Sequence, residues 1–596
     1  MNNHKYKYGI IGNGAYSALV DDKANIGWMC WPKFDSSCIF GSLLDEEKGG
    51  RFSIQPEWDG FTSSQKYIQN TNIIETIFEC EDGIYKVIDF APRFRQYERF
   101  YKPLMLVRKI IPIKGRPRIR VSCKPVGNYG EIVTKKVFGS SHIRFEGLES
   151  QVRLTTNIPL SYVDQEMPFV LNSEKYLVLT WGAPLEAPLE SSAENYLQQT
   201  IRYWHQWVKN TTTESFHQEA IIRSALTLKL HQYQDTGAIV TATTTSLPEF
   251  PGSGRTWDYR YCWIRDAHFT IKALNDLSHF SILEDYVNFI ENIALNDDNR
   301  FNQFYPVALD KFQKEKIVPL KGYLGNRPVR VGNDTFNKKQ NHVYGQILVT
   351  LLPFFDDKRF TINDDSTLKI MAENCLDIIE EIFNEKDTGL WDSLGTEQYY
   401  CYTFLSHWVG CNAAYKIAKS IQNEKMMLKA KNLIAQAKVK IESCYNVENE
   451  SYSSAIGIQQ SDASLFQLIN FGYLDPKSEK ARQLVEKLEN DLLSEKTELI
   501  YSYRHQDDFG APESTKLICT FWYIQALATI GEHEKASKLF DNTLKFANHL
   551  GLLSETVHDN TGGQWGNFPH TYSHVGLINA AMCIARKINK PNYLID

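Results

Sequence analysis

Residues 194–209, ENYLQQTIRYWHQWVK, mark the point at which the hydrophobic pattern of the chain changes. Their apolar and aromatic side chains recur every three or four residues, a spacing typical of an amphipathic helix. The sequence before this segment has the alternation of strands, and the sequence after it has helical periodicity. We therefore expect a helical linker, residues 186–215, between two domains of different class.

Residues 1–185 are predicted to form the first domain. Short segments such as 73–79, 85–90 and 175–181 alternate apolar and polar side chains, and turn clusters such as Glu81-Asp82-Gly83 separate them. Strands that alternate in this way bury one face each, so two antiparallel sheets packed face to face are the natural arrangement. The prediction is an N-terminal antiparallel β-sandwich.

Residues 216–596 are predicted to form the second domain. Apolar residues recur at helical spacing in about a dozen segments. They include 218–232, 264–278, 341–355, 366–384, 403–420, 424–443, 476–493, 514–531, 534–548 and 572–587. Helices in such a number need to pair around a shared core, and six helical hairpins closed into a toroid would achieve this. Periodicity alone leaves an α-solenoid open, although the sequence has no fixed-period repeat.

Composition excludes several classes of protein. The chain has 596 residues, of which 43% are hydrophobic and 23% charged, and its formal net charge is −6. These values are ordinary for a folded protein and provide no basic surface for nucleic acid or an anionic membrane. No apolar run reaches the ~18 residues of a spanning helix, and the N-terminus has no apolar targeting segment, so we expect a cytoplasmic protein. The 11 cysteines form no C-x-x-C pair, which argues against a disulfide framework or a zinc site.

The densest motif is RTWDYRYCWIRD at residues 255–266, preceded by SLPE at 246–249. Arg and Asp side chains can hydrogen-bond adjacent sugar hydroxyls, while aromatic rings pack on the apolar face of a pyranose. The motif therefore predicts a sugar-binding site. The alternative interpretation is a structural ion-pair network at the start of a helix.

At this point the sequence resembles glycoside hydrolase family 15, in particular the prokaryotic glucoamylases and trehalases with an N-terminal β-sandwich. The resemblance extends over nearly the whole chain. It rests on GIIGNG at 9–14, WMCWPKFDS at 28–36, the motif at 255–266, GYLGNRPVRVGN at 322–333, VYG at 343–345, GLLSE at 551–555 and GNFP at 566–569.

The resemblance implies an (α/α)6 barrel with a closed pocket for one terminal sugar at one rim. Arg265 and Asp266 match the Arg-Asp pair that holds the non-reducing glucose in the family. Arg327 matches an arginine that contacts the same pocket. Trp257 and Trp263 are expected to form its wall.

Glu555, in GLLSETV, matches the family's catalytic base. An inverting glycosidase needs one protonated carboxyl to release the leaving oxygen and one carboxylate across the ring to activate water, ~6.5–9.5 Å apart. The alternative interpretation is that Glu555 is an ordinary loop glutamate with no catalytic role.

The family's catalytic acid is a glutamate in a G-[IL]-W-E motif, and this chain has GLWD at residues 389–392. We assign Asp392 as the general acid, with Trp391 as a neighbouring sugar contact and Glu397 as a possible substitute for the acid. Aspartate is one methylene shorter, and the 394–404 stretch also departs from the family pattern. These departures bear on leaving-group specificity and on whether the acid is fully competent.

The sequence thus favours an exo-acting, inverting glycoside hydrolase of the glucoamylase type, which releases glucose from the non-reducing ends of small α-glucosides. The alternative within the family is an α,α-trehalase. The alternative of another class, prompted by Asp392, is a catalytically impaired sugar-binding or regulatory protein. Two carboxyls can perform both chemical roles, so no metal or organic cofactor is expected. The sequence leaves the oligomeric state open.

Overall fold

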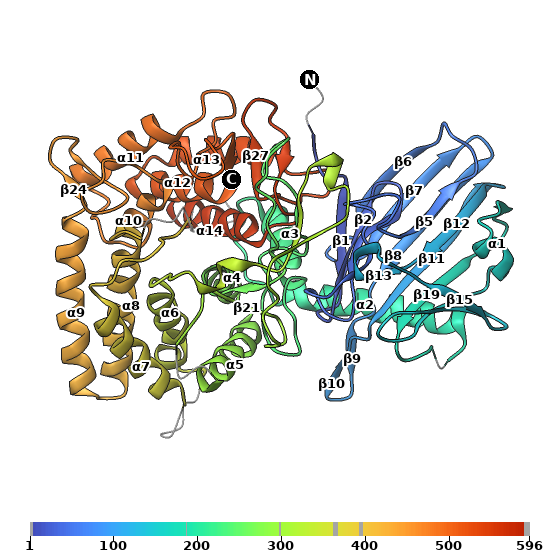
Figure 1. Ribbon diagram of the computed structural model, residues 1–596, viewed down its shortest axis with the longest axis horizontal. Helices are drawn as coiled ribbons and strands as arrows, with labels where there is room; N and C mark the ends of the chain where they lie inside the picture. The colour runs from blue at the N-terminus through green and yellow to red at the C-terminus, as the bar shows by residue number, and fades with distance from the viewer. Residues whose placement is uncertain (1–3, 186, 297–299, 361–366, 392–396, 589–596) are drawn as a thin grey trace, which may run out of the picture.

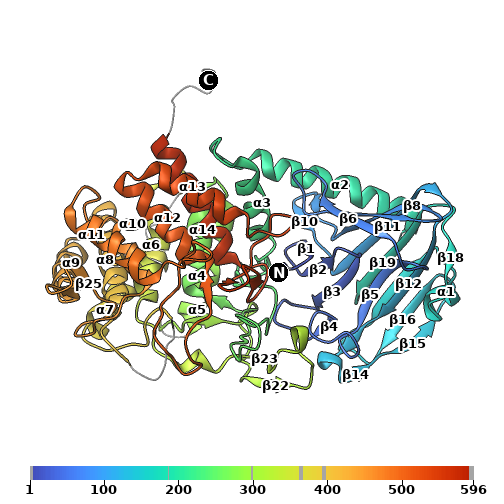
Figure 2. The same cartoon turned by 90° about the horizontal axis from the view of Figure 1, so that it is seen from above.

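The computed structural model describes residues 4–185, 187–296, 300–360, 367–391 and 397–588. A strand-rich N-terminal part and a helical C-terminal part lie side by side in both views (Figures 1 and 2). Within the described ranges, each helix is too short or too polar to span a lipid bilayer.

The N-terminal part is an antiparallel β-sandwich, as predicted. One sheet has the order β1-β2-β3-β5-β12-β18, with β4 paired to β3, and the other has the order β15-β16-β17-β19-β11-β8-β7-β6. The first consists of β1 (Tyr8–Gly12), β2 (Ser17–Asp21), β3 (Asn25–Cys30), β4 (Cys38–Phe40), β5 (Arg51–Pro56), β12 (Arg118–Lys124) and β18 (Phe169–Val170). The second consists of β6 (Thr62–Tyr67), β7 (Ile74–Cys80), β8 (Gly83–Phe90), β11 (Met105–Gly115), β15 (Lys135–Phe138), β16 (His142–Glu146), β17 (Val152–Thr156) and β19 (Lys175–Trp181).

Alternation along β19 determines what each face of the second sheet contacts. Leu177 and Leu179 pack in the core between the two sheets. Tyr176 and Val178 point the other way and pack with helix α2 (Leu189–Lys209). Figure 2 shows α2 lying along the outside of the sandwich. The linker helix predicted from its apolar stripe is therefore a cover for the sheet as well as a connection.

The C-terminal part is an α/α barrel whose helices alternate between an outer and an inner position (Figure 1). The outer helices are α3 (Gln218–Lys229), α5 (Phe280–Asn296), α7 (Thr367–Ile382), α9 (Glu424–Glu442), α11 (Glu479–Leu492) and α13 (His533–Leu544). The inner helices are α4 (Ile264–Asp276), α6 (Val343–Asp356), α8 (Cys401–Ser420), α10 (Gln467–Asn470), α12 (Leu517–Ile530) and α14 (Thr571–Ile588).

The sequences of the helices explain which ring each occupies. Outer helix α9 buries one stripe at spacings of three or four residues, as expected for a helix with one solvated face. The stripe consists of Met426, Ala430, Leu433, Ala437 and Ile441. Inner helix α12 buries nearly every side chain, because neighbouring helices surround it.

The start of α12 differs from the sequence-based expectation. The periodic segment 514–531 predicts a helix from residue 514, but the helix begins at Leu517. The three preceding residues form strand β26 (Ser514–Lys516), which pairs with β27 (Thr556–His558). Short strands elsewhere in the barrel part are β20 (Cys262–Trp263), β21 (Phe304–Tyr305), β22 (Lys316–Val318), β23 (Val329–Val331), β24 (Tyr445–Asn446), β25 (Ser451–Tyr452) and β28 (Gln564–Trp565).

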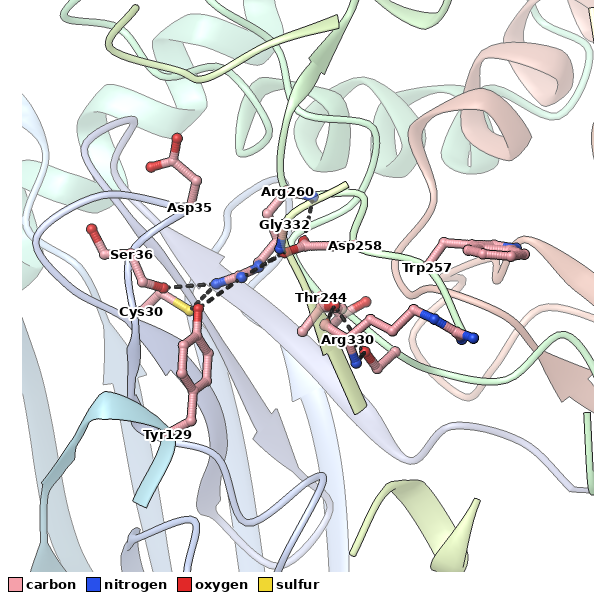
Figure 3. Close-up of polar contacts among 12 residues, drawn as sticks. Cys30, Asp35, Ser36, Tyr129, Thr244, Trp257, Asp258, Arg260, Arg330 and Gly332 are labelled. Atoms are coloured by element: carbon pink, nitrogen blue, oxygen red, sulfur yellow. Dashed lines mark hydrogen bonds and ion pairs between the residues drawn. The ribbon is translucent and has the colours of Figure 1, made fainter. Parts of the chain in front are cut away.

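A buried polar network joins the sandwich to the barrel (Figure 3). Arg260, which has no exposed side-chain surface, donates to the backbone oxygen of Ser36 at 2.7 Å and to the hydroxyl of Tyr129 at 2.9 Å. Its guanidinium also forms a two-point ion pair with Asp258, at 2.9 and 2.7 Å. Asp258 accepts a further bond from the backbone nitrogen of Gly332 at 3.0 Å. The network fixes the 255–266 segment against the sandwich.

Replacing Asp258 with alanine is expected to lower the free energy of unfolding by about 3–5 kcal/mol, because the buried charge of Arg260 would lose its partner. The shift of the denaturant midpoint, followed by circular dichroism, measures the effect. The matched control is Asp276→Ala, which removes an exposed ion pair with Lys272 on α4 and should cost less than about 1 kcal/mol. Equal effects of the two changes would contradict the role given to the network.

Candidate active site

A cavity of about 190 Å³ opens at the rim where inner helices α4, α12 and α14 begin. Its walls come from five stretches of chain that are far apart in the sequence. They are 241–266, with Thr241, Glu249, Arg255, Trp257, Tyr259, Trp263, Arg265 and Asp266; 333–338, with Asn333, Thr335 and Lys338; 390–391, with Leu390 and Trp391; 502–518, with Tyr503, Asp507, Phe509, Lys516 and Ile518; and 555–572, with Glu555, His570 and Tyr572. Most of the residues predicted for the sugar site therefore lie around one cavity.

The motif at 255–266 supplies one wall because its extended segment alternates between two environments. Trp257, Tyr259 and Trp263 line the cavity. Arg260, between them in sequence, donates to Ser36 and Tyr129 of the sandwich, and Asp258 pairs with Arg260 and accepts from the backbone of Gly332 (Figure 3). The same motif thus contains both aromatic residues that line the cavity and the buried ion pair of the alternative interpretation.

Arg265 and Asp266 lie in the first turn of α4. Arg265 donates through Nε to Asp266 at 3.0 Å and through Nη1 to the backbone oxygen of Leu390 at 2.7 Å. Asp266 also accepts from the hydroxyl of Thr241 at 2.8 Å. These bonds fix both side chains at the cavity wall and tie the Leu390 loop to the same place.

Glu555 precedes β27 and is only 2% exposed. Its Oε1 accepts from Lys516 Nζ at 2.6 Å, and the hydroxyl of Tyr259 lies 3.5 Å from the same oxygen. Its Oε2 accepts from the backbone nitrogen of Asn567 at 3.3 Å. Gly566, with φ of +74°, leaves room for this side chain, because a Cβ there would lie 2.7 Å from Cβ of Glu555.

Glu249 and Lys516 line the cavity, although no sequence motif gives either of them a role. Lys516 Nζ lies 3.3 Å from Glu249 Oε1 and so contacts both glutamates. Burial raises the pKa of Glu249 more than the ammonium of Lys516 lowers it, and the charge of Glu555 adds to the rise. Burial opposes the charged form of Lys516, but the two carboxylates outweigh it and hold the pKa of the ammonium well above its usual value.

This arrangement argues against Glu249 as the acid partner of Glu555. The two carboxylates of an inverting pair flank the glycosidic bond with a sugar and a water between them. Here the ammonium of Lys516 lies between Glu249 and Glu555. His570 is no better a donor, because burial lowers its pKa to about 3 and leaves the imidazole neutral.

The loop expected to carry the acid is anchored at both ends. Asp387 and Gln398 exchange two backbone hydrogen bonds, of 3.1 and 2.9 Å, and Asp387 accepts from Thr403 at 2.9 Å. Leu390 and Trp391 line the cavity. Asp392, the proposed acid, follows Trp391 directly and lies outside the described residues. Glu397, its possible substitute, is exposed and is not part of the cavity wall.

Arg327 is not brought together with the other predicted site residues. Its side chain is exposed, and it does not line the cavity. Arg330, three residues later on β23, lies behind Trp257 with its guanidinium 5.1 Å from the ring centroid. It donates to the backbone oxygen of Gly254 at 2.8 Å. Arg330 therefore supports the wall to which Trp257 belongs.

Some buried hydrogen-bond donors in the wall have no partner among the described residues. They include Nε1 of Trp263 and the hydroxyl of Tyr572, on side chains that are 4% and 5% exposed. Buried donors normally have partners, so a ligand with hydroxyl groups would satisfy them. No cluster of three His, Cys, Asp or Glu side chains suited to a metal ion occurs within the described ranges.

Comparisons with known proteins match both parts of the chain. The family model "Glycosyl hydrolases family 15" matches residues 215–582, and the model "Trehalase-like, N-terminal" matches residues 5–158. A trehalase from Thermoplasma volcanium is 29% identical over 96% of this chain and 92% of its own length. A trehalase from Mycobacterium tuberculosis is 28% identical over 97% and 89% of the two chains.

The fold has a solved counterpart. A bacterial glucoamylase in complex with acarbose superposes with a TM-score of 0.69 and 14% identity, over 98% of this chain and 94% of its own. Together with the family model, which matches more than half of the chain, the sandwich and the α/α barrel show that the protein belongs to glycosyl hydrolases family 15.

Proposed function

We propose that the protein hydrolyses α,α-trehalose to two glucose molecules with inversion at the attacked carbon. The sequence motifs alone favour a glucoamylase, with a trehalase as the alternative. The relatives reverse that order, because proteins named trehalase align with nearly the whole chain. The likeness to the glucoamylase is one of fold.

The cavity would hold one glucose unit. Arg265 and Asp266 would hydrogen-bond its hydroxyls, and Trp257 and Trp263 would pack on its apolar face. The unpaired donors of Trp263 and Tyr572 support this assignment, since sugar hydroxyls would give them acceptors.

In the reaction, Glu555 would accept a proton from a water molecule whose oxygen bonds to the anomeric carbon. The glycosidic bond breaks on the opposite face of the ring, and its electron pair remains on the leaving oxygen. Asp392 would protonate that oxygen, so the second sugar leaves as neutral glucose. The buried carboxylate of Glu555 in the cavity wall is the observation that carries the proposal.

The anomers of the products test both substrate and stereochemistry. Inversion of one half of trehalose gives β-glucose, while the leaving half keeps its α configuration, so equal amounts of the two anomers are expected at early times. Proton NMR within the first minutes, before mutarotation, distinguishes them. Maltose, isomaltose and maltotriose serve as parallel substrates, and each should be hydrolysed at least ~10-fold more slowly than trehalose.

Each other outcome has a definite meaning. α-Glucose alone would exclude inversion. Hydrolysis of maltotriose but not of trehalose would restore the glucoamylase hypothesis. Binding of glucose or trehalose without hydrolysis of any glucoside would favour the sugar-binding alternative that Asp392 prompted.

A further inference from the structure

A lysine lies between two glutamates in the wall of the cavity. Nζ of Lys516 is 2.6 Å from Oε1 of Glu555 and 3.3 Å from Oε1 of Glu249. The side chains of the lysine and the two glutamates are 18%, 3% and 12% exposed. Desolvating three charges is costly, so their position calls for an explanation.

Local structure places Lys516 at an unfavourable site for a cation. It is the residue immediately before α12, where the helix dipole favours negative charge. Strand pairing nevertheless holds it there, because Lys516 lies opposite Thr556 in the β26–β27 ladder. The backbone nitrogen of Leu517 also donates to the backbone oxygen of Glu555 at 3.3 Å. The ammonium and Glu555 are thus held together by the backbone as well as by charge.

The contacts of Glu555 differ between its two oxygens. Oε1 accepts the short bond from Lys516 and has the Tyr259 hydroxyl 3.5 Å away. Oε2 accepts only one long bond, 3.3 Å, from Asn567 among the described residues. A carboxylate oxygen has two acceptor sites, so Oε2 keeps one for a further partner.

We infer that Lys516 is a positioning residue, which is itself held by Glu249, fixes Oε1 of Glu555 and leaves Oε2 as the atom that accepts the proton from the attacking water. This inference rests on the proposed function, since it assumes that Glu555 is the base. Glu249 is assigned the second positioning role, because it holds the ammonium without flanking the bond that breaks.

Other charged or titratable groups surround these three side chains. They are Tyr6, Arg255, Tyr259, Asp266, Tyr503, Cys519 and His570. Burial raises the pKa of the three tyrosines and of Cys519, and it lowers that of His570 to about 3. These five groups therefore keep their charge state across the neutral range.

The decisive variant is Lys516→Met, assayed on trehalose as a pH profile of kcat and kcat/KM. Misplacing the base should lower kcat by about 10²-fold with little change in KM. Without the ammonium, the two facing carboxylates keep a proton to higher pH, so the acid limb of the profile should move upward by about 1 pH unit. Lys516→Arg keeps the charge and should restore the acid limb and part of kcat.

Glu249→Gln provides a test of opposite sign. Removing one negative charge leaves Lys516 paired with Glu555 alone, which favours the ionised carboxylate. The acid limb should therefore move to lower pH. Thermal unfolding shows whether Lys516→Met folds. If it does not, the acid limbs of Glu249→Gln and Lys516→Arg still test the positioning role of Lys516.

The matched control is Lys109→Met in the sandwich. Lys109 also contacts two glutamates, Glu194 at 2.7 Å and Glu174 at 3.2 Å, but lies outside the cavity. It should leave both limbs of the profile unchanged. The inference is overturned if wild type is active and the Lys516 and Glu249 variants leave the acid limb in place. If wild type hydrolyses no glucoside, the proposed function fails first and the inference fails with it.

Discussion

Glu555→Gln is expected to lower the turnover of trehalose by ~10²–10⁴-fold, the range typical of losing general-base catalysis. Glutamine keeps the length and shape of the side chain but cannot accept a proton from water. The carbonyl oxygen of the glutamine side chain can accept the hydrogen bond from Lys516 in place of Oε1, so the cavity should keep its shape. Steady-state kinetics give the loss, and titration calorimetry with trehalose should show affinity within a few-fold of wild type.

The matched control for this variant is Glu513→Gln. Glu513 is on the same stretch of chain as Lys516, but its side chain is 57% exposed and does not line the cavity. Its loss should leave turnover unchanged. Near-normal hydrolysis by Glu555→Gln would remove Glu555 from the role of base, whereas lost binding would indicate a collapsed site.

The main elements of the fold could be predicted because their local patterns agree with their surroundings. The alternation of 175–181 matches β19, whose two faces contact different layers. The apolar spacing of 424–443 matches α9, which has one buried stripe. The stripe of α9 arises from burial on one side and can be recognised without knowing the partner.

Elements fixed by distant contacts could not be predicted in the same way. Residues 514–516 continue the helical pattern of 517–530 but pair with β27, some 40 residues later. A short inner helix such as α10 is too brief for periodicity to reveal. For residues 514–516 the tertiary contact overrides the local preference.

The residues of the candidate site could also be predicted only in part. Arg265, Asp266 and Glu555 could be predicted as site residues because their motifs are specific, and the structure places them around one cavity. Lys516 had no such signal, since a lysine at the start of a predicted helix is ordinarily a solvated charge. Only the ladder between β26 and β27 brings it to Glu555.

Asp392→Asn is expected to lower turnover of trehalose by ~10²–10⁴-fold while affecting an aryl α-glucoside much less. The leaving glucose of trehalose is a poor leaving group that needs protonation, whereas a nitrophenolate needs little. The ratio of the two losses, measured side by side, therefore separates proton donation from substrate positioning. Equal losses on both substrates would assign Asp392 to positioning.

Asp392→Glu decides whether the loop kept the family geometry around a shorter acid. The described parts of the loop are held by the Asp387–Gln398 pairing and by the bond from Arg265 to the backbone oxygen of Leu390. If the backbone places residue 392 as the family places its glutamate, the added methylene moves the carboxyl toward the leaving oxygen, and turnover should rise. If the loop has re-formed around aspartate, glutamate should overreach and turnover should fall by about 10²-fold, the cost of a misplacement of about 1 Å. Inactivity of both forms on every glucoside, with trehalose still bound, would assign the cavity to sugar binding alone.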